Sequence, residues 1–422
     1  MKNILFNIIR VKGNLEDCKN AFYTLLDPSF LKSVAKQTNS LDIRERKLTL
    51  NSFTFLMLFG CSLSKKVELS ELANKAIEWD LINGDSITKQ RISQQIDERG
   101  FEYFKKLFEH LLEVFLNLNR DMRKKITSEF KHIYAVDSTT IELAHKMISQ
   151  FEGTKKQAAI KVHTKFDLAS RIPVQFKMTD AKRHDSMESF QETDVENILW
   201  LRDLGYYDFD LFLEIENSNS YYVSRVKDNI IFEIMDSNLN NQKLSATTLD
   251  SLTKDFKPRY DLIIRLSNTS LVRLVGYFDK IEQEYRFYIT NLMDHFQWTT
   301  TEIIQLYKKR WLIEIFFRYF KRVLGCFKIS FESERRIQSQ IWICFTYFVL
   351  IMLFMVMMSI KCKIDFSSLS FKECSKYFVS KLVVRNMLEI YKIPNFIESI
   401  LFFPQNHISR FINYNSRSKS MF

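Results

Sequence analysis

The sequence predicts an α/β protein with helical regions at both ends and a strand-rich middle. Three observations support this fold class. Up to about residue 130, apolar residues recur at spacings of three and four, which is the helical period. From His132 the pattern changes to short runs rich in β-branched and aromatic residues, which favour strands. After Tyr307, long apolar segments without Pro again indicate helices. A chain of 422 residues is long enough for two or three domains.

The composition indicates a folded, basic protein. Hydrophobic residues make up 46% of the chain, and 61 Lys and Arg against 50 Asp and Glu give a net charge of +11. This charge favours a polyanion partner such as nucleic acid, although a basic surface can also serve solubility alone. Glycine is rare, and neither a P-loop nor a dinucleotide fingerprint is present. Six scattered cysteines without a Cys-x-x-Cys pair predict reduced thiols in a cytoplasmic protein, and the apolar start is too short for a secretory signal.

The N-terminal region contains several amphipathic segments. Helical apolar spacing is found in Phe30–Lys36, Phe53–Leu63, Leu69–Ile77 and Phe101–Leu118. Residues 85–88 predict a cap for a polar helix that begins at Lys89. Together with the Leu69 helix, this helix could form a DNA reader of the helix-turn-helix type, or it could be an ordinary surface helix pair.

The middle of the chain predicts a succession of strands. The predicted strands are His132–Leu143, Ala158–Asp167, Ile172–Asp180, Ile198–Asp203, Tyr221–Lys227, Asn229–Ile234, Tyr260–Leu266, Leu271–Phe278 and Tyr285–Thr290. Asp137 interrupts the first strand, where a carboxylate is costly unless a metal ion or hydrogen bonds compensate for burial. Alternatively, Asp137 is a residue at the end of the strand that caps the next turn.

The stretch Tyr307–Lys321, YKKRWLIEIFFRYFK, has no Gly or Pro and predicts one helix. At ~3.6 residues per turn, Tyr307, Arg310, Glu314 and Lys321 share a stripe about 60° wide. A carboxylate on that stripe suits a divalent metal ion, and cations one or two turns away suit phosphates. The alternative is an ordinary i,i+4 ion pair between Arg310 and Glu314.

The spacing Y-(2)-R-(3)-E-(6)-K resembles the signature of DDE transposases of the insertion-sequence-four family. The phrases AVDSTTI, KVHTKFDL and KRHDS at residues 135–141, 161–168 and 182–186 also resemble that family. The resemblance spans about Ile133 to Ile360. It implies a ribonuclease H-like catalytic core with a β-rich insertion, a helical N-terminal domain and a helical C-terminal region. The implied domains are 1–130 for DNA-end binding, 131–350 for catalysis with the insertion at about 228–289, and 351–422.

The resemblance also implies a catalytic site. Asp137, Asp203 and Glu314 would be the catalytic and metal-binding acids. Leu204 stands where many family members have Arg, which keeps Asp208 and Asp210 open as the second acid. Two Mg²⁺ ions, for which Mn²⁺ can substitute, would activate water and stabilise the leaving 3′ oxygen. The residues expected to bind DNA are Tyr307, Arg310, Lys321, Arg318, Arg225 and Lys227.

The implied function is cut-and-paste DNA transposition. The partners would be double-stranded DNA, namely the terminal inverted repeats and the target, and a second copy of the chain in the paired-end complex. The family further implies a DNA-hairpin intermediate and a cytoplasmic, nucleoid-associated protein. The alternative is a catalytically idle relative that binds the repeats and regulates.

A last segment opens a different possibility. Ile341–Ile360 holds 20 residues without a charge, which is long enough to span a bilayer. No second such segment exists in the sequence, so we expect a buried core helix rather than a membrane span.

Overall fold

The structure is a computed structural model that describes residues 15–384, with gaps at 42–46, 62–66, 119–128, 154–156, 186–187, 189, 191–194, 239–246, 255, 267–270, 327 and 330. The predicted tail beyond residue 384 therefore lies outside the described residues. The chain divides into two compact units. Unit 1 comprises residues 1–126, 140–160 and 316–422, and unit 2 comprises 127–139 and 161–315.

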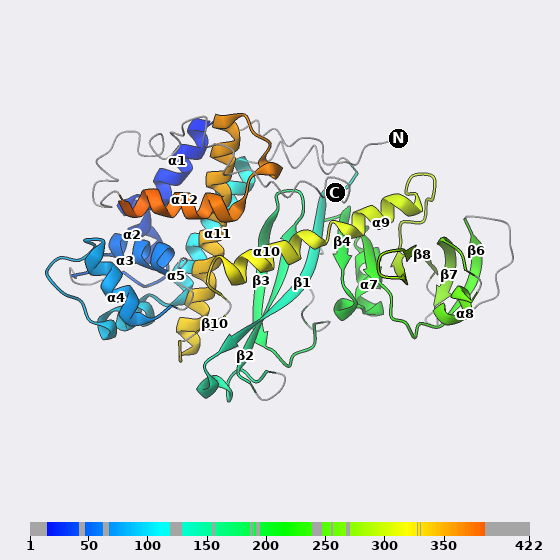
Figure 1. Ribbon diagram of the computed structural model, residues 1–422, viewed down its shortest axis with the longest axis horizontal. Coiled ribbons are helices and arrows are strands. Elements are labelled where there is room, and N and C mark those ends of the chain that lie inside the picture. The colour runs from blue at the N-terminus through cyan, green and yellow to red at the C-terminus, as the bar shows by residue number, and fades with distance from the viewer. Residues whose placement is uncertain are drawn as a thin grey trace. The chain divides into compact units, whose positions relative to one another are not determined.

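Unit 1 is mainly helical. Its elements are α1 (Leu15–Leu26), α2 (Pro28–Gln37), α3 (Leu50–Phe55), the π-helical η1 (Leu56–Gly60), α4 (Leu69–Glu78), α5 (Lys89–Leu118), η2 (His145–Met147), β10 (Lys328–Ile329), α11 (Glu334–Cys362), η6 (Phe366–Ser368) and α12 (Phe371–Val384). Figure 1 labels α1 to α5, α11, α12 and β10 of this unit. The helical regions expected at both ends of the sequence are confirmed, and the structure places both in this unit.

The core of unit 1 is built by α5 and α11. The Phe108 ring lies 5.5 Å from that of Trp342 and 5.9 Å from that of Phe345. Among the described residues, α11 is the one helix long and apolar enough to cross a membrane, and 94% of its most apolar window is buried inside the structure. It is therefore packed as the core helix that the sequence favoured.

The helix pair α4 and α5 departs from a helix-turn-helix reader. Thr88 caps α5 as expected, because its Oγ1 accepts a hydrogen bond from the Arg91 amide at 3.3 Å. Residues 79–88 separate the two helices, whereas a helix-turn-helix joins its helices by three or four residues. Gly100 gives α5 a sharp kink with φ of 68° and ψ of 178°, a combination that glycine alone adopts without strain.

Unit 2 is built on a mixed sheet. Its elements are β1 (His132–Leu143), β2 (Ala159–Asp167), β3 (Ile172–Asp180), β4 (Ile198–Arg202), η5 (Leu204–Tyr206), α7 (Phe209–Asn217), β5 (Tyr221–Arg225), β6 (Phe232–Ser237), α8 (Leu249–Thr253), β7 (Arg259–Leu266), β8 (Leu271–Asp279), β9 (Glu284–Thr290), α9 (Thr300–Lys308) and α10 (Trp311–Arg322). The last residues of β1, the first of β2 and the second half of α10 belong to unit 1. The strand order is β3-β2-β1-β4-β5-β9-β8-β7-β6.

The strand order divides the sheet into a core and an insertion. Strands β1, β4 and β5 are parallel, and β3-β2-β1-β4-β5 is the order of a ribonuclease H-like sheet. From β5 onward every pairing is antiparallel, and β9 lies directly against β5. The predicted mixed fold with a β-rich insertion is therefore confirmed. The insertion extends the same sheet, and one apolar cluster that includes Trp200, Tyr222, Leu262 and Ile289 is shared by both parts.

Candidate active site

Two predicted acids lie at neighbouring parallel strands, Asp137 within β1 and Asp203 directly after β4. The pairing of β1 with β4 runs from His132 and Ile198 to Val136 and Arg202. Asp137 and Asp203 are the next residues after these two paired segments, so they occupy matching positions at one end of the paired region. Carboxyl ends of parallel strands are where α/β sheets bind ligands. Asp137 therefore lies at a sheet position suited to chemistry, and its strand continues beyond it.

The remaining candidates come from the joint between α9 and α10. The Tyr307 hydroxyl donates to Asp203 Oδ1 at 3.2 Å. Arg310 donates through Nη1 to Asp137 Oδ2 at 2.8 Å and through Nη2 to Glu314 Oε1 at 2.6 Å. One tyrosine and one arginine therefore connect the signature segment to both strand acids. These contacts bring together five residues that lie as much as 177 positions apart in the sequence (314 − 137).

The signature stretch is two helices, which differs from the single helix that the sequence predicted. Helix α9 ends at Lys308 and α10 begins at Trp311. Across the joint the amides of Lys309 and Arg310 bond to carbonyls three residues back, at 3.1 and 2.9 Å. Such bonds tighten the backbone relative to an α-helix, so the angles worked out for one straight helix do not hold. The Tyr307 and Arg310 side chains reach Asp203 and Asp137 separately from this joint.

The ion pair between Arg310 and Glu314 that the alternative interpretation expected is present. It belongs to a larger cluster, however, because the same guanidinium contacts Asp137. Burial works against the charge of Arg310, but Tyr307, Asp137 and the other acids together raise its pKa above its usual value. Arg310 is therefore firmly cationic at the centre of the acids.

The acids still have an excess of negative charge. Burial raises the pKa of Asp137 to about 6, since Arg310 and the Ser138 amide lower it too little to compensate, and Asp203 and Glu314 raise it further. A carboxyl group in this state gains from additional positive charge nearby. The electrostatics of Asp137 thus favour a bound cation.

The donor set fits a hard divalent cation, because carboxylate oxygens are the ligands of Mg²⁺. Among the residues that the structure describes, no three Asp, Glu, His or Cys side chains form a group ready to hold a metal ion. The contacts of Arg310 account for this, since its guanidinium lies between Asp137 and Glu314. A metal ion between these two carboxylates requires that Arg310 release at least one of them.

Asp208 and Asp210 have a local structural role. Asp208 is the N-cap of α7, and its Oδ1 accepts a hydrogen bond from the Asp210 amide at 3.0 Å. Asp210 stands in the first turn of that helix, where a negative charge is favourable. Asp203 is the member of this acidic stretch that contacts Tyr307.

The four other cations predicted to bind DNA have different surroundings. Arg225 ends β5 opposite Tyr288, and the Lys227 amine lies 5.2 Å from the centre of the Tyr207 ring. Arg318 is exposed on α10. Lys321 follows on the same helix, and burial lowers its pKa although Glu142 acts against that shift.

A second group of polar residues adjoins Asp137. The Ser138 hydroxyl donates to Asp185 Oδ1 at 2.8 Å, and His163 lies between Tyr206 and Thr179. The sequence signal for Asp185 was the phrase KRHDS, to which no role was assigned. His163 is fully buried and serves as a hydrogen-bonded core histidine.

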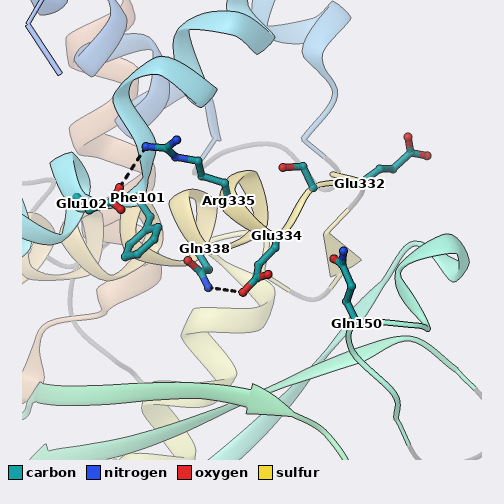
Figure 2. Close-up of a pocket in the computed structure, with 8 residues that line it drawn as sticks. Phe101, Glu102, Gln150, Glu332, Glu334, Arg335 and Gln338 are labelled. Carbon is teal, nitrogen blue, oxygen red and sulfur yellow. Dashed lines mark hydrogen bonds and ion pairs between the residues drawn. The ribbon is translucent and has the colours of Figure 1, made fainter. Parts of the chain in front are cut away.

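The hollow drawn in Figure 2 lies in unit 1 and contains none of the predicted site residues. Its lining is Phe101, Glu102, Gln150, Glu332, Ser333, Glu334, Arg335 and Gln338. Arg335 pairs with Glu102 at 3.7 Å, and Gln338 donates to Glu334 at 3.0 Å. Three glutamates against one arginine make this surface a poor match for a polyanion.

This arrangement defines a domain of the DDE type, which carries out phosphoryl transfer on nucleic acids. It consists of parallel strands with acids at matching positions and of the signature helices α9 and α10. Residues 128–350, more than half of the chain, match the family described as "Transposase DDE domain". The chain belongs to this family, which confirms the assignment made from the sequence. Its members are generally dependent on divalent metal ions.

Curated relatives are transposases of insertion sequence elements. The probable transposase for IS5377 of Geobacillus stearothermophilus is 24% identical over 62% of this chain and 65% of its own length. The transposase for IS231F of Bacillus thuringiensis subsp. israelensis is 20% identical over 52% and 46%, and that for IS1151 of Clostridium perfringens is 21% identical over 76% of each. The chain thus spans less than two thirds of the length of the first two of these relatives.

One solved structure is also similar to this chain. It is the piggyBac transposase in a synaptic complex with hairpin DNA, with a TM-score of 0.47 and 11% identity, and the match covers 94% of this chain and 86% of that chain.

Proposed function

We propose that this protein is a cut-and-paste DNA transposase that cleaves the ends of an insertion sequence and joins them to target DNA. The observation that carries the proposal is the meeting of Asp137, Asp203 and Glu314 through Tyr307 and Arg310. Membership of the DDE domain family supports it. The protein would act in the cytoplasm on nucleoid DNA, as two copies that pair the two ends.

Each side chain has a role in this proposal. Asp137, Asp203 and Glu314 would hold two Mg²⁺ ions, or Mn²⁺, which supply an activated water and stabilise the leaving 3′ oxygen. Tyr307 holds Asp203 through its hydroxyl. Arg310, once it releases a carboxylate, can offer its planar fork of donors to a phosphate. Arg225, Lys227, Arg318 and Lys321 would bind further phosphates and position the DNA.

The ion pairs of Arg310 are the observation that favours the second candidate, a catalytically idle protein that binds terminal repeats and regulates. If Arg310 never releases its carboxylates, no metal ion can bind between Asp137 and Glu314. Incubation of the protein with labelled end DNA and Mg²⁺ or Mn²⁺ separates the two candidates. Metal-dependent strand cleavage supports the transposase, and end binding without cleavage supports the regulator.

The second acid is tested by three matched substitutions. Asp203→Asn is expected to lower end cleavage at least about 100-fold, because a metal ligand contributes several kcal/mol of transition-state stabilisation. Asp208→Asn should retain most of the activity, because Asn is as good an N-cap as Asp, and Asp210→Asn should do so because it removes only a favourable charge from the first turn of α7. Cleavage of labelled end DNA measures all three. An inactive, folded Asp208→Asn protein together with an active Asp203→Asn protein would mean that Asp208 is the second acid.

DNA binding is expected to depend steeply on salt, because a chain of net charge +11 that neutralises phosphates releases condensed counterions. Affinity for end DNA should fall at least about 100-fold between about 50 and 200 mM salt. Gel-shift titrations with end DNA and with random DNA of equal length measure this. Binding that is insensitive to salt would contradict a phosphate-based interface.

A further inference from the structure

One carboxylate next to the proposed acids has no role in the reaction described above. Asp185 stands in the segment after β3, and its side chain is 26% exposed. Its Oδ1 accepts a hydrogen bond from Ser138 Oγ at 2.8 Å. The same oxygen lies 3.3 Å from Lys161 Nζ and 3.5 Å from His163 Nδ1. Asp185 is therefore held by a hydroxyl donor and a lysine, with the His163 ring beside it.

The contact with Ser138 connects Asp185 to the first acid. Ser138 directly follows Asp137, and its backbone amide donates to Asp137 Oδ1 at 2.8 Å. The residue that orients the Asp137 carboxylate is thus itself fixed by Asp185. Loss of that hydrogen bond frees the Ser138 side chain and loosens the amide that orients Asp137.

A different contact connects Asp185 to the second acid. Asp203 opens a tight turn that the Tyr206 amide closes by donating to the Asp203 carbonyl at 2.9 Å. Inside this turn, Gly205 packs so closely that a Cβ atom on it would lie 3.1 Å from Asp185 Oδ2. The turn that carries Asp203 therefore rests on the same carboxylate that holds Ser138.

His163 supports the same turn with a defined tautomer. Thr179 Oγ1 donates its hydrogen to the Asp180 carbonyl at 3.0 Å, so it accepts from His163 Nε2, which lies 3.0 Å away. The neutral His163 then carries its hydrogen on Nε2 and accepts from the Tyr206 hydroxyl through Nδ1 at 3.2 Å. Burial lowers the pKa of His163, which agrees with the neutral form.

We propose that Asp185 is a positioning residue that sets the spacing of Asp137 and Asp203. It touches Ser138 on one side and the turn at Gly205 on the other, so one side chain fixes both strand ends. This inference rests on the proposed assignment of Asp137 and Asp203 as metal-binding acids. Residues that orient metal ligands typically contribute about 10- to 100-fold to metal affinity or activity.

The test measures Mn²⁺ binding to the full chain without DNA, by the electron paramagnetic resonance signal of free Mn²⁺, alongside end cleavage. Asp185→Ala is expected to weaken Mn²⁺ binding about 10-fold or more. Asp185→Asn keeps an oxygen that can accept from Ser138, so it should recover part of this loss. Ser138→Ala should also weaken Mn²⁺ binding. Combining it with Asp185→Ala should add little, because both substitutions remove the same hydrogen bond.

Two further variants test the geometry. Gly205→Ala should also weaken Mn²⁺ binding, since its new methyl group presses on Asp185. Glu188→Gln is the matched control: Glu188 stands in the same segment and pairs with Lys177 and Arg183 instead. It should bind Mn²⁺ as the unmodified protein does. Melting curves identify any variant that is unfolded, and the Ser138 and Gly205 variants then carry the test.

The outcomes distinguish a wrong assignment of the metal-binding acids from a wrong positioning role of Asp185. If Asp137→Asn leaves both Mn²⁺ binding and cleavage intact, the acid assignment is wrong. If Asp137→Asn abolishes both while folded Asp185→Ala, Ser138→Ala and Gly205→Ala proteins behave normally, the acids stand and the positioning role of Asp185 is overturned.

Discussion

Glu314→Gln is expected to abolish metal-dependent strand cleavage while leaving end binding intact. The substitution keeps the size of the side chain and removes the charge that would hold a metal ion. We expect cleavage to fall at least about 100-fold. Binding should persist, because phosphate contacts supply much of the affinity for DNA. Loss of the i,i+4 ion pair with Arg310 alone should cost only about 0.2–0.5 kcal/mol of stability.

Cleavage assays with Mg²⁺ and with Mn²⁺, gel shifts and melting curves test this expectation together. Glu233→Gln is a suitable control, because it removes one carboxylate from unit 2 whose ion pair with Arg265 is exposed. Near-normal cleavage by a folded Glu314→Gln protein would show that the cluster is an ordinary ion-pair network and would remove the basis of the active-site assignment.

Two neighbouring substitutions separate metal and phosphate roles in the same assays. Arg310→Lys should lower cleavage, since the lysine amine is a point charge and cannot offer a phosphate the planar fork of donors that a guanidinium does. Lys321→Ala should instead weaken end binding and leave Mn²⁺ binding unchanged.

The largest expected effect on stability is at a buried ion pair in the insertion. Arg273 on β8 donates to both carboxylate oxygens of Asp261 on β7, at 2.7 and 2.5 Å, and the Arg273 residue is fully buried. Thr300 donates to Asp261 at 2.6 Å. Burial raises the pKa of Asp261, but hydrogen bonds from Arg273, Thr300 and Asn238 bring it below its usual value. Arg273→Met is expected to destabilise the protein by about 3–5 kcal/mol, because it leaves a buried carboxylate without its cation.

Arg265→Met is the matched control on the neighbouring strand. Its pair with Glu233 is 3.0 Å long, but both side chains are exposed, so the cost should be about 0–1 kcal/mol. Urea unfolding of both variants gives the comparison. Equal free energies of unfolding would mean that the Asp261 pair contributes no more than a surface pair. Because Thr300 begins α9, we also expect Arg273→Met to lower cleavage through the helix that carries Tyr307.

Much of this architecture could be predicted because its signals are local. The first strand was predicted as His132–Leu143, which are its observed bounds, since β-branched and aromatic residues fill it. The separation of α9 from α10 could not be predicted in this way. Nothing between Tyr307 and Glu314 breaks a helix by its own propensity. The joint is associated with contacts of Tyr307 and Arg310 to residues more than 100 positions earlier.

The surroundings of the acids could not be predicted either, because they depend on contacts between distant parts of the sequence. Spacing alone identified Glu314, and a carboxylate inside a strand drew attention to Asp137. The role of Asp185 depends on contacts with Ser138, 47 positions away, and with Gly205 in another turn. Such contacts exist only after β1, β3 and β4 have assembled, so no periodicity in the sequence reports them.

The direct pairing of β9 with β5 has a consequence for attempts to make a smaller enzyme. In this antiparallel pairing, Val223, Ser224 and Arg225 of β5 lie opposite Thr290, Ile289 and Tyr288 of β9. Removal of residues 228–289 takes away most of that neighbour and leaves β5 as an open edge with unpaired amides and carbonyls. Open edges of this kind recruit other chains and cause aggregation. A trimmed enzyme therefore has to retain β9, or replace it with another strand that closes the edge.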